Sequence, residues 1–325
     1  MKKWTLALAA VTAVVMAGSA AAFPTRPLTI VVPFAAGGPT DKVARDFAQS
    51  FSQILKQNVI VENVGGAGGT LGATRVARAQ PDGHTLLLFH IGMATTASLY
   101  RNLPYKPLED FEYLGMINDS PMTLVGRPTL PPNNYAELRK WLDENKGKVN
   151  LANAGLGSAS HLCGLLFQQM LGIPMTTIAY KGTAPAMTDI LGGQVDIMCD
   201  QTTNTVPQIA GGRIKAYAVS TLQPLKSPPA LANLPTLDSQ GLKGFNVSIW
   251  HGLYAPKGTP AAAQKVLNDA LREVLKDQEF VGRMEALGAV IVTDDRVDPA
   301  GHKKFVANEI EVWGKAIRAA GQYAD

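Results

Sequence analysis

The stretch Leu28-Thr-Ile-Val-Val-Pro-Phe-Ala-Ala-Gly-Gly-Pro-Thr-Asp41 decides the fold of this chain. Its first five residues form a short, β-branched run that is typical of a buried strand, and apolar residues recur at helical spacing after Asp41. Between the two, Gly37 and Gly38 can adopt positive φ and expose backbone N–H groups. A helix that begins just after these glycines would direct its unpaired N–H groups and its positive dipole end at the same loop. The stretch therefore predicts either a loop that binds an anion or an ordinary strand-to-helix turn of an α/β domain.

Residues 1–22 carry the pattern of a secretory signal peptide. Lys2 and Lys3 form a basic start, the stretch from Trp4 to Met16 is apolar, and residues 20–22 are small alanines suited to cleavage. This apolar stretch is shorter than the roughly 20 residues that a membrane-spanning helix needs. We therefore expect an exported, soluble protein whose mature chain starts at Phe23. No lipid anchor is expected, because no cysteine follows the apolar stretch.

Charge and metal-ligand spacing exclude several classes of protein. The chain has a formal net charge of +4, which falls to +2 when Lys2 and Lys3 leave with the leader. The remaining Lys and Arg residues are scattered among acids, so we expect no nucleic-acid partner. The histidines show no paired metal-ligand spacing, and no metal is expected.

The two cysteines, Cys163 and Cys199, allow two interpretations. Export favours a disulfide, but a domain of this size does not need one for its stability. We expect two small buried thiols and leave a disulfide open.

Two domains of α/β type are expected, because a mature chain of about 300 residues is longer than a single hydrophobic core usually supports. Strands are predicted at 28–32, 59–62, 85–89, 111–117, 122–125, 150–153, 177–180, 195–198, 214–220 and 247–254. Besides the helix after Gly38, helices are predicted at 69–79, 135–145, 160–171, 185–191, 261–275 and 299–320. The alternation predicts right-handed crossovers and two parallel sheets.

A second strand-to-helix turn repeats the design of the first, in Asn150-Leu-Ala-Asn-Ala-Gly-Leu-Gly-Ser-Ala-Ser-His161. Ser158 and Ser160 are candidate N-caps of the helix that follows. Because ligands of open α/β sheets bind outside the carboxyl ends of the strands, two such turns on two domains would face each other across a cleft. We place one domain at residues 23–123 plus 248–325 and the other at 124–247, with the chain crossing near 122–127 and 245–254.

Motifs spread in order over the whole mature chain resemble the Bug family, the periplasmic solute-binding proteins of tripartite tricarboxylate transporters. They are Pro24-Thr-Arg-Pro27, Val32-Pro-Phe-Ala-Ala-Gly-Gly-Pro-Thr-Asp41, Val61-Glu-Asn-Val-Gly-Gly-Ala-Gly-Gly-Thr70, Ala79-Gln-Pro-Asp-Gly-His84, Gly155-Leu-Gly-Ser-Ala-Ser-His161, Tyr180-Lys-Gly-Thr-Ala-Pro185, Leu191-Gly-Gly-Gln-Val-Asp196 and Trp250-His-Gly-Leu-Tyr-Ala-Pro-Lys-Gly-Thr-Pro260. The resemblance implies a type II periplasmic-binding-protein fold, in which two Rossmann-like α/β domains are joined by two hinge crossings around a cleft. It also implies capture of a small organic carboxylate, a dicarboxylate, tricarboxylate or aromatic acid, and its delivery to membrane permease subunits. We expect a monomer in the periplasm, with no cofactor and no catalysis.

Carried over residue by residue, the resemblance places the ligand between the two turns. From the first domain it implies contacts by Phe34, Ala35, Ala36, Gly37, Gly38, Thr40 and Asp41, partly through backbone groups and ordered waters. From the second domain it implies contacts by Gly157, Ser158, Ala159, Ser160, Tyr180, Lys181, Gly182, Asp200, Thr203 and Asn204. His90 stands where small polar residues are expected, so it is a candidate for ligand selectivity.

Several of these residues have a structural alternative. Asp41 could simply complement the dipole of its helix, and Lys181 could be an ordinary surface lysine. His90 could be a histidine packed at a strand end. Ser158 and Ser160 are N-caps in either interpretation. The glycine run 65–69 lacks the lysine and hydroxyl residue of a nucleotide loop, so no phosphate cradle is expected there.

Two other functions stay open on the sequence. An exported serine hydrolase would use Ser158 with His161, although the Gly-x-Ser-x-Gly motif is absent. A carboxylate sensor that docks on a membrane signalling partner would use the same fold as a transport receptor. The sequence does not predict which carboxylate is bound.

Overall fold

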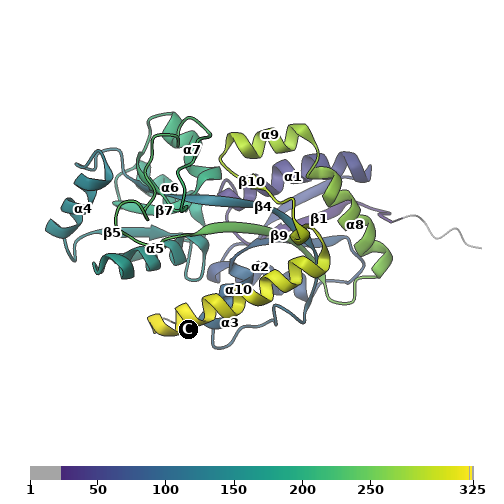
Figure 1. Ribbon diagram of the computed structural model, residues 1–325. Helices are drawn as coiled ribbons and strands as arrows, with labels where there is room; N and C mark the ends of the chain where they lie inside the picture. The colour runs from purple at the N-terminus through teal and green to yellow at the C-terminus, as the bar shows by residue number, and fades with distance from the viewer. Residues whose placement is uncertain (1–22, 322, 324–325) are drawn as a thin grey trace, which may run out of the picture.

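The computed structural model describes residues 23–321 and 323, so the predicted signal peptide at 1–22 lies outside the described residues. Within them, ten strands form one mixed sheet in the order β2-β1-β3-β9-β4-β7-β5-β6, and β8 and β10 also pair with β4. The long strands β4 (Phe111–Gly126) and β9 (Ser248–Pro256) run across the middle of the molecule in Figure 1. The sheet therefore has two halves that share β4.

The first half-sheet consists of β1, β2, β3, β9, β10 and residues 111–121 of β4. Strand β1 pairs in parallel with β2 and β3, whereas β9 is antiparallel to both β3 and β4. Buried Val43, Phe47 and Phe51 fix the apolar face of the first helix. The bounds are β1 (Leu28–Val32), α1 (Pro39–Leu55), β2 (Val59–Asn63), η1 (Ala67–Gly69), α2 (Thr70–Ala77), β3 (Thr85–His90), α3 (Gly92–Leu99), α8 (Ala261–Val274), α9 (Gln278–Ala286), β10 (Val290–Ile291), η2 (Asp295–Val297) and α10 (Pro299–Ala320).

The second half-sheet consists of residues 122–126 of β4 together with β5, β6, β7 and β8. Strand β5 is parallel to β6 and β7, while β7 and β8 are antiparallel to β4. In Figure 1 these elements gather at the end of the molecule opposite α1 and α8. The bounds are α4 (Tyr135–Glu144), β5 (Asn150–Asn153), α5 (Ala159–Leu171), β6 (Thr176–Ala179), α6 (Thr183–Leu191), β7 (Ile197–Gln201), α7 (Thr202–Ala210) and β8 (Lys215–Val219).

Two expectations about the strands are wrong. The sheet is mixed rather than parallel, because β4 and β9 return directly beside neighbours that run the other way. The two strands expected at 111–117 and 122–125 are one strand, β4. Residues 118–121, which the prediction left between the two strands, continue β4: Asn118 and Ser120 are buried and Pro121 pairs with Ser248 of β9. Pairing with β9 therefore keeps residues 118–121 in the strand, although their sequence is not typical of a strand.

Three helices escaped the sequence-based prediction. The helix α3 is buried on most of its surface, so its sequence shows no amphipathic period. The helix α7 contains Pro207, which indicates a break rather than a helix. The helix α9 is short and follows α8 after three residues, with Asp277 as its N-cap.

The preference for free thiols is also wrong. Cys163 on α5 and Cys199 on β7 form a disulfide, with their Cα atoms 6.0 Å apart. The packing of α5 against β7 brings the two residues together across 36 positions of sequence. The size of a domain indicates whether a disulfide is needed for stability. It does not indicate whether two cysteines lie close enough to form one.

Candidate functional site

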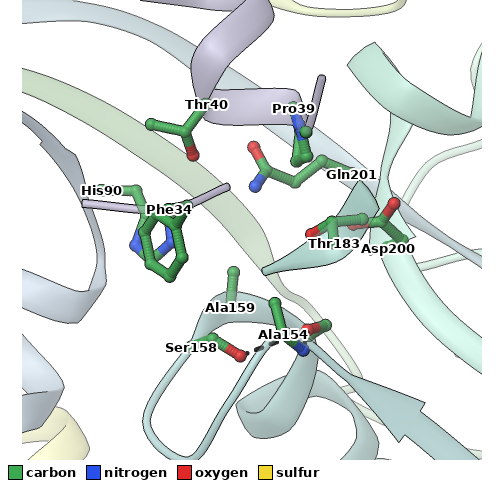
Figure 2. A pocket seen from close by; sticks show the side chains of 12 residues that line it. Phe34, Pro39, Thr40, His90, Ala154, Ser158, Ala159, Thr183, Asp200 and Gln201 are labelled. Atoms are coloured by element: carbon green, nitrogen blue, oxygen red, sulfur yellow. Dashed lines mark hydrogen bonds between the residues drawn. The ribbon is translucent and has the colours of Figure 1, made fainter. Parts of the chain in front are cut away.

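A pocket lies where α1, α5, α6 and α7 begin, between the two half-sheets (Figure 2). The space between its walls is about 270 Å³, which includes the opening to solvent. The lining residues are Phe34, Gly38, Pro39, Thr40 and His90 on the side of the first half-sheet, and Ala154, Ser158, Ala159, Ser160, Thr183, Asp200 and Gln201 on the side of the second. Every one of these helices directs its N-terminus at the pocket, and such ends favour negative charge.

No lysine or arginine is among the residues that line this pocket. An anion in this pocket would therefore meet the positive ends of the helices and neutral side-chain donors, and it would form no salt bridge with a lining residue. Among the lining residues, Asp200 is the only one with a carboxyl group.

Ser158 and Ser160 shape the second turn. The Ser158 hydroxyl is the N-cap of α5 and accepts the His161 backbone N–H at 3.3 Å. The Ser160 hydroxyl accepts the Ala154 N–H at 2.8 Å and lies 3.2 Å from the Ser158 hydroxyl. Both side chains are buried at the pocket wall, as Figure 2 shows for Ser158. Ser158 is an N-cap as expected, whereas Ser160 lies within the first turn of α5 and bonds the Ala154 N–H instead, so the expectation that Ser160 is an N-cap is wrong. Both residues line the pocket.

Asp41 faces its own loop. Its carboxylate accepts the Gly37 N–H at 2.8 Å, the Arg45 side chain at 2.9 Å and the Asn63 amide at 2.9 Å. Burial opposes ionisation, but these hydrogen bonds hold the pKa of Asp41 below its ordinary value. Asp41 therefore fixes the loop as an anion and is absent from the pocket lining.

The two glycines of this loop differ in conformation. Gly37 has a φ of +80°, as expected, and allows the tight turn over Asp41. Gly38 has a φ of −81°, so of the two glycines only Gly37 uses the positive φ that the sequence allows at both. A Cβ at Gly38 would make only ordinary contacts, at 3.5 Å from the Ala35 carbonyl oxygen and 3.7 Å from the Thr183 Cβ.

His90 lines the pocket at the end of β3 and stacks on Phe34, with ring centroids 4.7 Å apart. Its Nδ1 accepts the Gly92 N–H at 2.9 Å, so the neutral ring carries its proton on Nε2. Burial, together with His251, lowers the pKa of His90 well below the ordinary value. His90 is therefore a neutral side chain with one N–H to donate.

Thr40 connects the pocket to the long strands. Its hydroxyl lies 3.5 Å from Nε2 of His251 on β9, and Nδ1 of His251 lies 2.9 Å from the Asn118 side-chain oxygen on β4. Burial lowers the pKa of His251 to about 3, so this ring is neutral. The pocket wall is thus connected to both strands that run between the half-sheets.

Asp200 is the next-to-last residue of β7 and is buried at the opposite side of the pocket from His90 (Figure 2). Burial raises the pKa of the Asp200 carboxyl to about 7, although the Asn204 amide donates to it at 2.7 Å. Hydrogen bonds from the Gln201 backbone and from Thr183 also oppose the rise. No salt bridge joins Asp200 to another side chain within the described part of the chain.

The pocket brings together eight of the residues that the sequence analysis proposed: Phe34, Gly38, Thr40, His90, Ser158, Ala159, Ser160 and Asp200. The remaining ones are outside the lining, namely Ala35, Ala36, Gly37, Asp41, Gly157, Tyr180, Lys181, Gly182, Thr203 and Asn204. Among these, Lys181 is exposed at the surface, and Tyr180 donates its hydroxyl to Asp189 at 2.5 Å. The Asn204 amide donates to Asp200, which does line the pocket.

Sequence reasoning left out Pro39, Ala154, Thr183 and Gln201 as lining residues. All of them stand at a strand-to-helix junction. Pro39, Thr183 and Gln201 are each next to a residue that was proposed, and Ala154 lies in the same turn as Gly157. Treating every such junction as a whole would have found them, because it is the helix N-terminus that faces the pocket.

The two half-sheets touch each other around the pocket. The Thr95 hydroxyl of α3 donates to the Gly157 carbonyl at 3.1 Å, and the Tyr100 hydroxyl donates to the Leu156 carbonyl at 3.2 Å. Gly182 has a φ of +143°, and a Cβ there would lie 2.8 Å from the Ala35 nitrogen. These contacts close the pocket.

Comparison with known proteins places the chain in a family. The sequence profile described as "Tripartite tricarboxylate transporter family receptor" matches residues 43–322. The chain belongs to this receptor family. A relative from Agrobacterium vitis, described as "UPF0065 protein in the TAR-I ttuE-ttuC' intergenic region", is 49% identical over 300 residues, which is 92% of this chain and 86% of the relative. The expected Bug-family resemblance is confirmed.

Solved structures confirm the expected periplasmic-binding-protein fold of this receptor. The structure of the periplasmic binding protein BugD is 50% identical with a TM-score of 0.89, and the match covers 93% of this chain and 99% of BugD. MatC from Rhodopseudomonas palustris with bound malate is 38% identical with a TM-score of 0.86, and the match covers 91% of this chain and 100% of MatC.

Membrane-spanning helices and metal-ligand clusters are both absent from the described residues. No helix there is both long and apolar enough to cross a membrane. No group of three or more His, Cys, Asp or Glu side chains in the same residues is placed to hold a metal ion.

Proposed function

We propose that this receptor-family protein is a periplasmic solute-binding protein that captures a small organic carboxylate for a tripartite tricarboxylate transporter. The observation that carries the proposal is the convergence of the α1, α5, α6 and α7 N-termini on a buried pocket whose lining has no lysine or arginine. Such a pocket offers fixed N–H and hydroxyl donors to an anion without a competing salt bridge. Malate bound to MatC, 38% identical, supports a carboxylate.

The proposed mechanism is closure of two lobes on the ligand. We assign residues 23–123 plus 248–325 to one lobe and 124–247 to the other, with β4 and β9 as the two crossings. In the open form both turns are hydrated; the ligand then bridges them, and closure exchanges its water for protein donors. The closed lobes together present the surface that membrane permease subunits recognise. We propose a monomer, since the pocket is complete within one chain.

Two alternatives are less well supported. For a serine hydrolase, His161 would have to act on the Ser158 hydroxyl, but the group that reaches this hydroxyl is the His161 backbone N–H, and the ring Nδ1 accepts the Gly157 N–H at 3.1 Å. A sensor would use the same closed form on another membrane partner. Crosslinking of the liganded protein in membranes, followed by identification of the partner, distinguishes a sensor from a transport receptor.

A thermal-shift screen tests the proposed ligand class. Succinate, malate and citrate are compared with their neutral amides, which have the same shape and no charge. A carboxylate at 100 times its Kd should add about 2.7 kcal/mol to the free energy of unfolding, and the amides should add nothing measurable. Equal stabilisation by amides and acids, or no stabilisation by any acid, contradicts the proposal.

Fractionation of the native host should recover the mature chain in the periplasm.

A further inference from the structure

The glycine-rich run at residues 65–69 lies outside the pocket, since none of its residues is among the lining. Its backbone is nevertheless unusual. The φ angles of Gly66, Ala67, Gly68 and Gly69 are +135°, +46°, +61° and +101°, so four consecutive residues have a positive φ. Ala67 carries a Cβ, for which such a φ is unfavourable. A backbone of this kind persists only where its surroundings hold it in place, so the contacts of the run indicate what it does.

Gly68 faces the turn that precedes α5 in the second half-sheet. It is buried, and a Cβ on it would collide with the carbonyl oxygen of Leu156 and lie 3.1 Å from the Tyr100 hydroxyl. From the opposite side, a Cβ on Gly155 would lie 3.5 Å from the Gly68 nitrogen. The backbones of the two halves therefore approach each other more closely than a side chain on Gly68 would allow.

The Leu156 carbonyl has little freedom to move aside. Its oxygen accepts the Tyr100 hydroxyl of the first half at 3.2 Å, and the Ser158 N–H closes the turn by donating to the Gly155 carbonyl at 3.0 Å. A long side chain can rotate away from an added methyl group, whereas a carbonyl fixed in a turn cannot. A Cβ on Gly68 would be relieved most directly by a shift of the second half away from the first.

Gly65 makes a similar contact with a different turn of the second half. A Cβ on Gly65 would lie 3.1 Å from the Lys181 carbonyl oxygen and 3.2 Å from the Ala35 nitrogen of its own half. The φ of Gly65 is not positive. Close approach, rather than a special backbone conformation, therefore favours glycine at this position.

We propose that Gly68 is a positioning residue for ligand retention: its missing side chain lets the two halves meet closely enough to hold a carboxylate between them, although Gly68 does not line the pocket. This inference rests on the proposed function, because closure of the halves retains only a ligand that lies between them. Binding to the open form needs no contact between residues 65–69 and the second half. Enlarging Gly68 should therefore speed release of the ligand more than it slows capture.

The test compares Gly68→Ala with the matched control Gly212→Ala. The two glycines have nearly the same φ, +61° and +62°, but a Cβ on Gly212 would meet nothing within 4 Å. Both variants therefore carry the same backbone strain, and only Gly68→Ala also forces the halves apart. Stopped-flow experiments measure association and dissociation rates for succinate, malate and citrate. We expect Gly68→Ala to release each acid that binds at least about tenfold faster, with association changed less than about twofold. Gly212→Ala should keep both wild-type rates.

Small-angle X-ray scattering measures closure directly. At a saturating concentration of the acid, Gly68→Ala should have a larger radius of gyration than the wild-type protein and Gly212→Ala. Gly65→Ala adds a Cβ at the same contact surface without positive-φ strain, so it serves where Gly68→Ala does not fold. We expect it to release the acid about threefold faster than the wild-type protein.

The outcomes separate this inference from the proposed function. If the wild-type protein binds an acid and the folded variant releases it at the wild-type rate, or closes to the wild-type radius, the positioning role is wrong and the carboxylate receptor stands. If Gly212→Ala releases the acid as fast as Gly68→Ala, backbone strain causes the effect and the positioning role is again wrong. If no carboxylate binds the wild-type protein, both proposals are wrong.

Discussion

Two aspartates of this protein show how the surroundings of a residue decide its chemistry. Asp41 receives hydrogen bonds from a backbone N–H, an arginine and an amide, and its pKa is lowered. Asp200 receives hydrogen bonds from neutral groups only, and burial raises its pKa to about 7. The guanidinium of Arg45 beside Asp41 makes the difference between the two pKa values, because Asp200 receives hydrogen bonds from neutral groups alone.

The raised pKa of Asp200 predicts how the stability of the ligand-free protein depends on pH. Between the unfolded value of 3.8 and the folded value of about 7, the folded state holds a proton that the unfolded state has lost. This group therefore contributes stability below pH 4, which is lost progressively as the pH rises to 7, at up to about 1.4 kcal/mol per pH unit.

Asp200→Asn removes this titration. Urea unfolding at pH 5, 6, 7 and 8 should show that the variant gains stability relative to the wild-type protein as the pH rises. A constant difference between the two proteins across this range would show that Asp200 titrates normally in the folded state.

At the scale of elements, the pocket is assembled from strand-to-helix junctions, and the disulfide joins two of them. Cys163 lies one turn into α5, whose cap Ser158 lines the pocket, and Cys199 directly precedes Asp200. The bond therefore fixes the spacing of the Ser158 and Asp200 walls within the second half-sheet.

Loss of this disulfide should destabilise the protein. The bridge closes 36 positions of sequence, so the chain-entropy estimate of its contribution is about 4 kcal/mol. Urea unfolding with and without a reductant should show a loss of roughly 2 to 4 kcal/mol. The Cys163→Ala/Cys199→Ala double variant is the control, since its stability should not respond to reductant. If the wild-type protein does not respond either, the disulfide does not contribute to stability.

At the scale of the whole molecule, α3 holds the two half-sheets together outside the pocket. The hydroxyls of Thr95 and Tyr100 donate to carbonyls of the loop before α5, and α10 packs along α3 behind them. Because these bonds join the halves, opening of the proposed lobes must break them. We therefore expect them to act as a latch on the proposed closed form.

Removing the latch should speed release of the ligand. Thr95→Val and Tyr100→Phe each delete one bond worth about 1 kcal/mol, so dissociation of bound carboxylate in stopped-flow displacement should be about fivefold faster in each variant. The matched control is Thr96→Val, whose hydroxyl lies 3.0 Å from the Tyr105 hydroxyl within the same half. It should lower stability without changing the dissociation rate. Equal dissociation rates in all four proteins would contradict a latch.

The sequence by itself determined the family, the first strand and helix, and the two glycine-containing turns that form opposite walls of the pocket. These features are local, because a β-branched run, a helical period and a helix cap each depend on a short stretch of consecutive residues. The turn residues Phe34, Gly38, Thr40, Ser158 and Ser160 could be proposed as site residues for that reason.

Only the tertiary structure decided how those local pieces act. The Cys163–Cys199 bond, the latch of Thr95 on Gly157 and the burial of Asp200 all depend on residues that are 36 or more positions apart or on packing from several elements. The antiparallel course of β4 and β9 likewise follows from pairing between distant strands. No local pattern encodes such contacts, because their free energy arises from the neighbours that folding brings together.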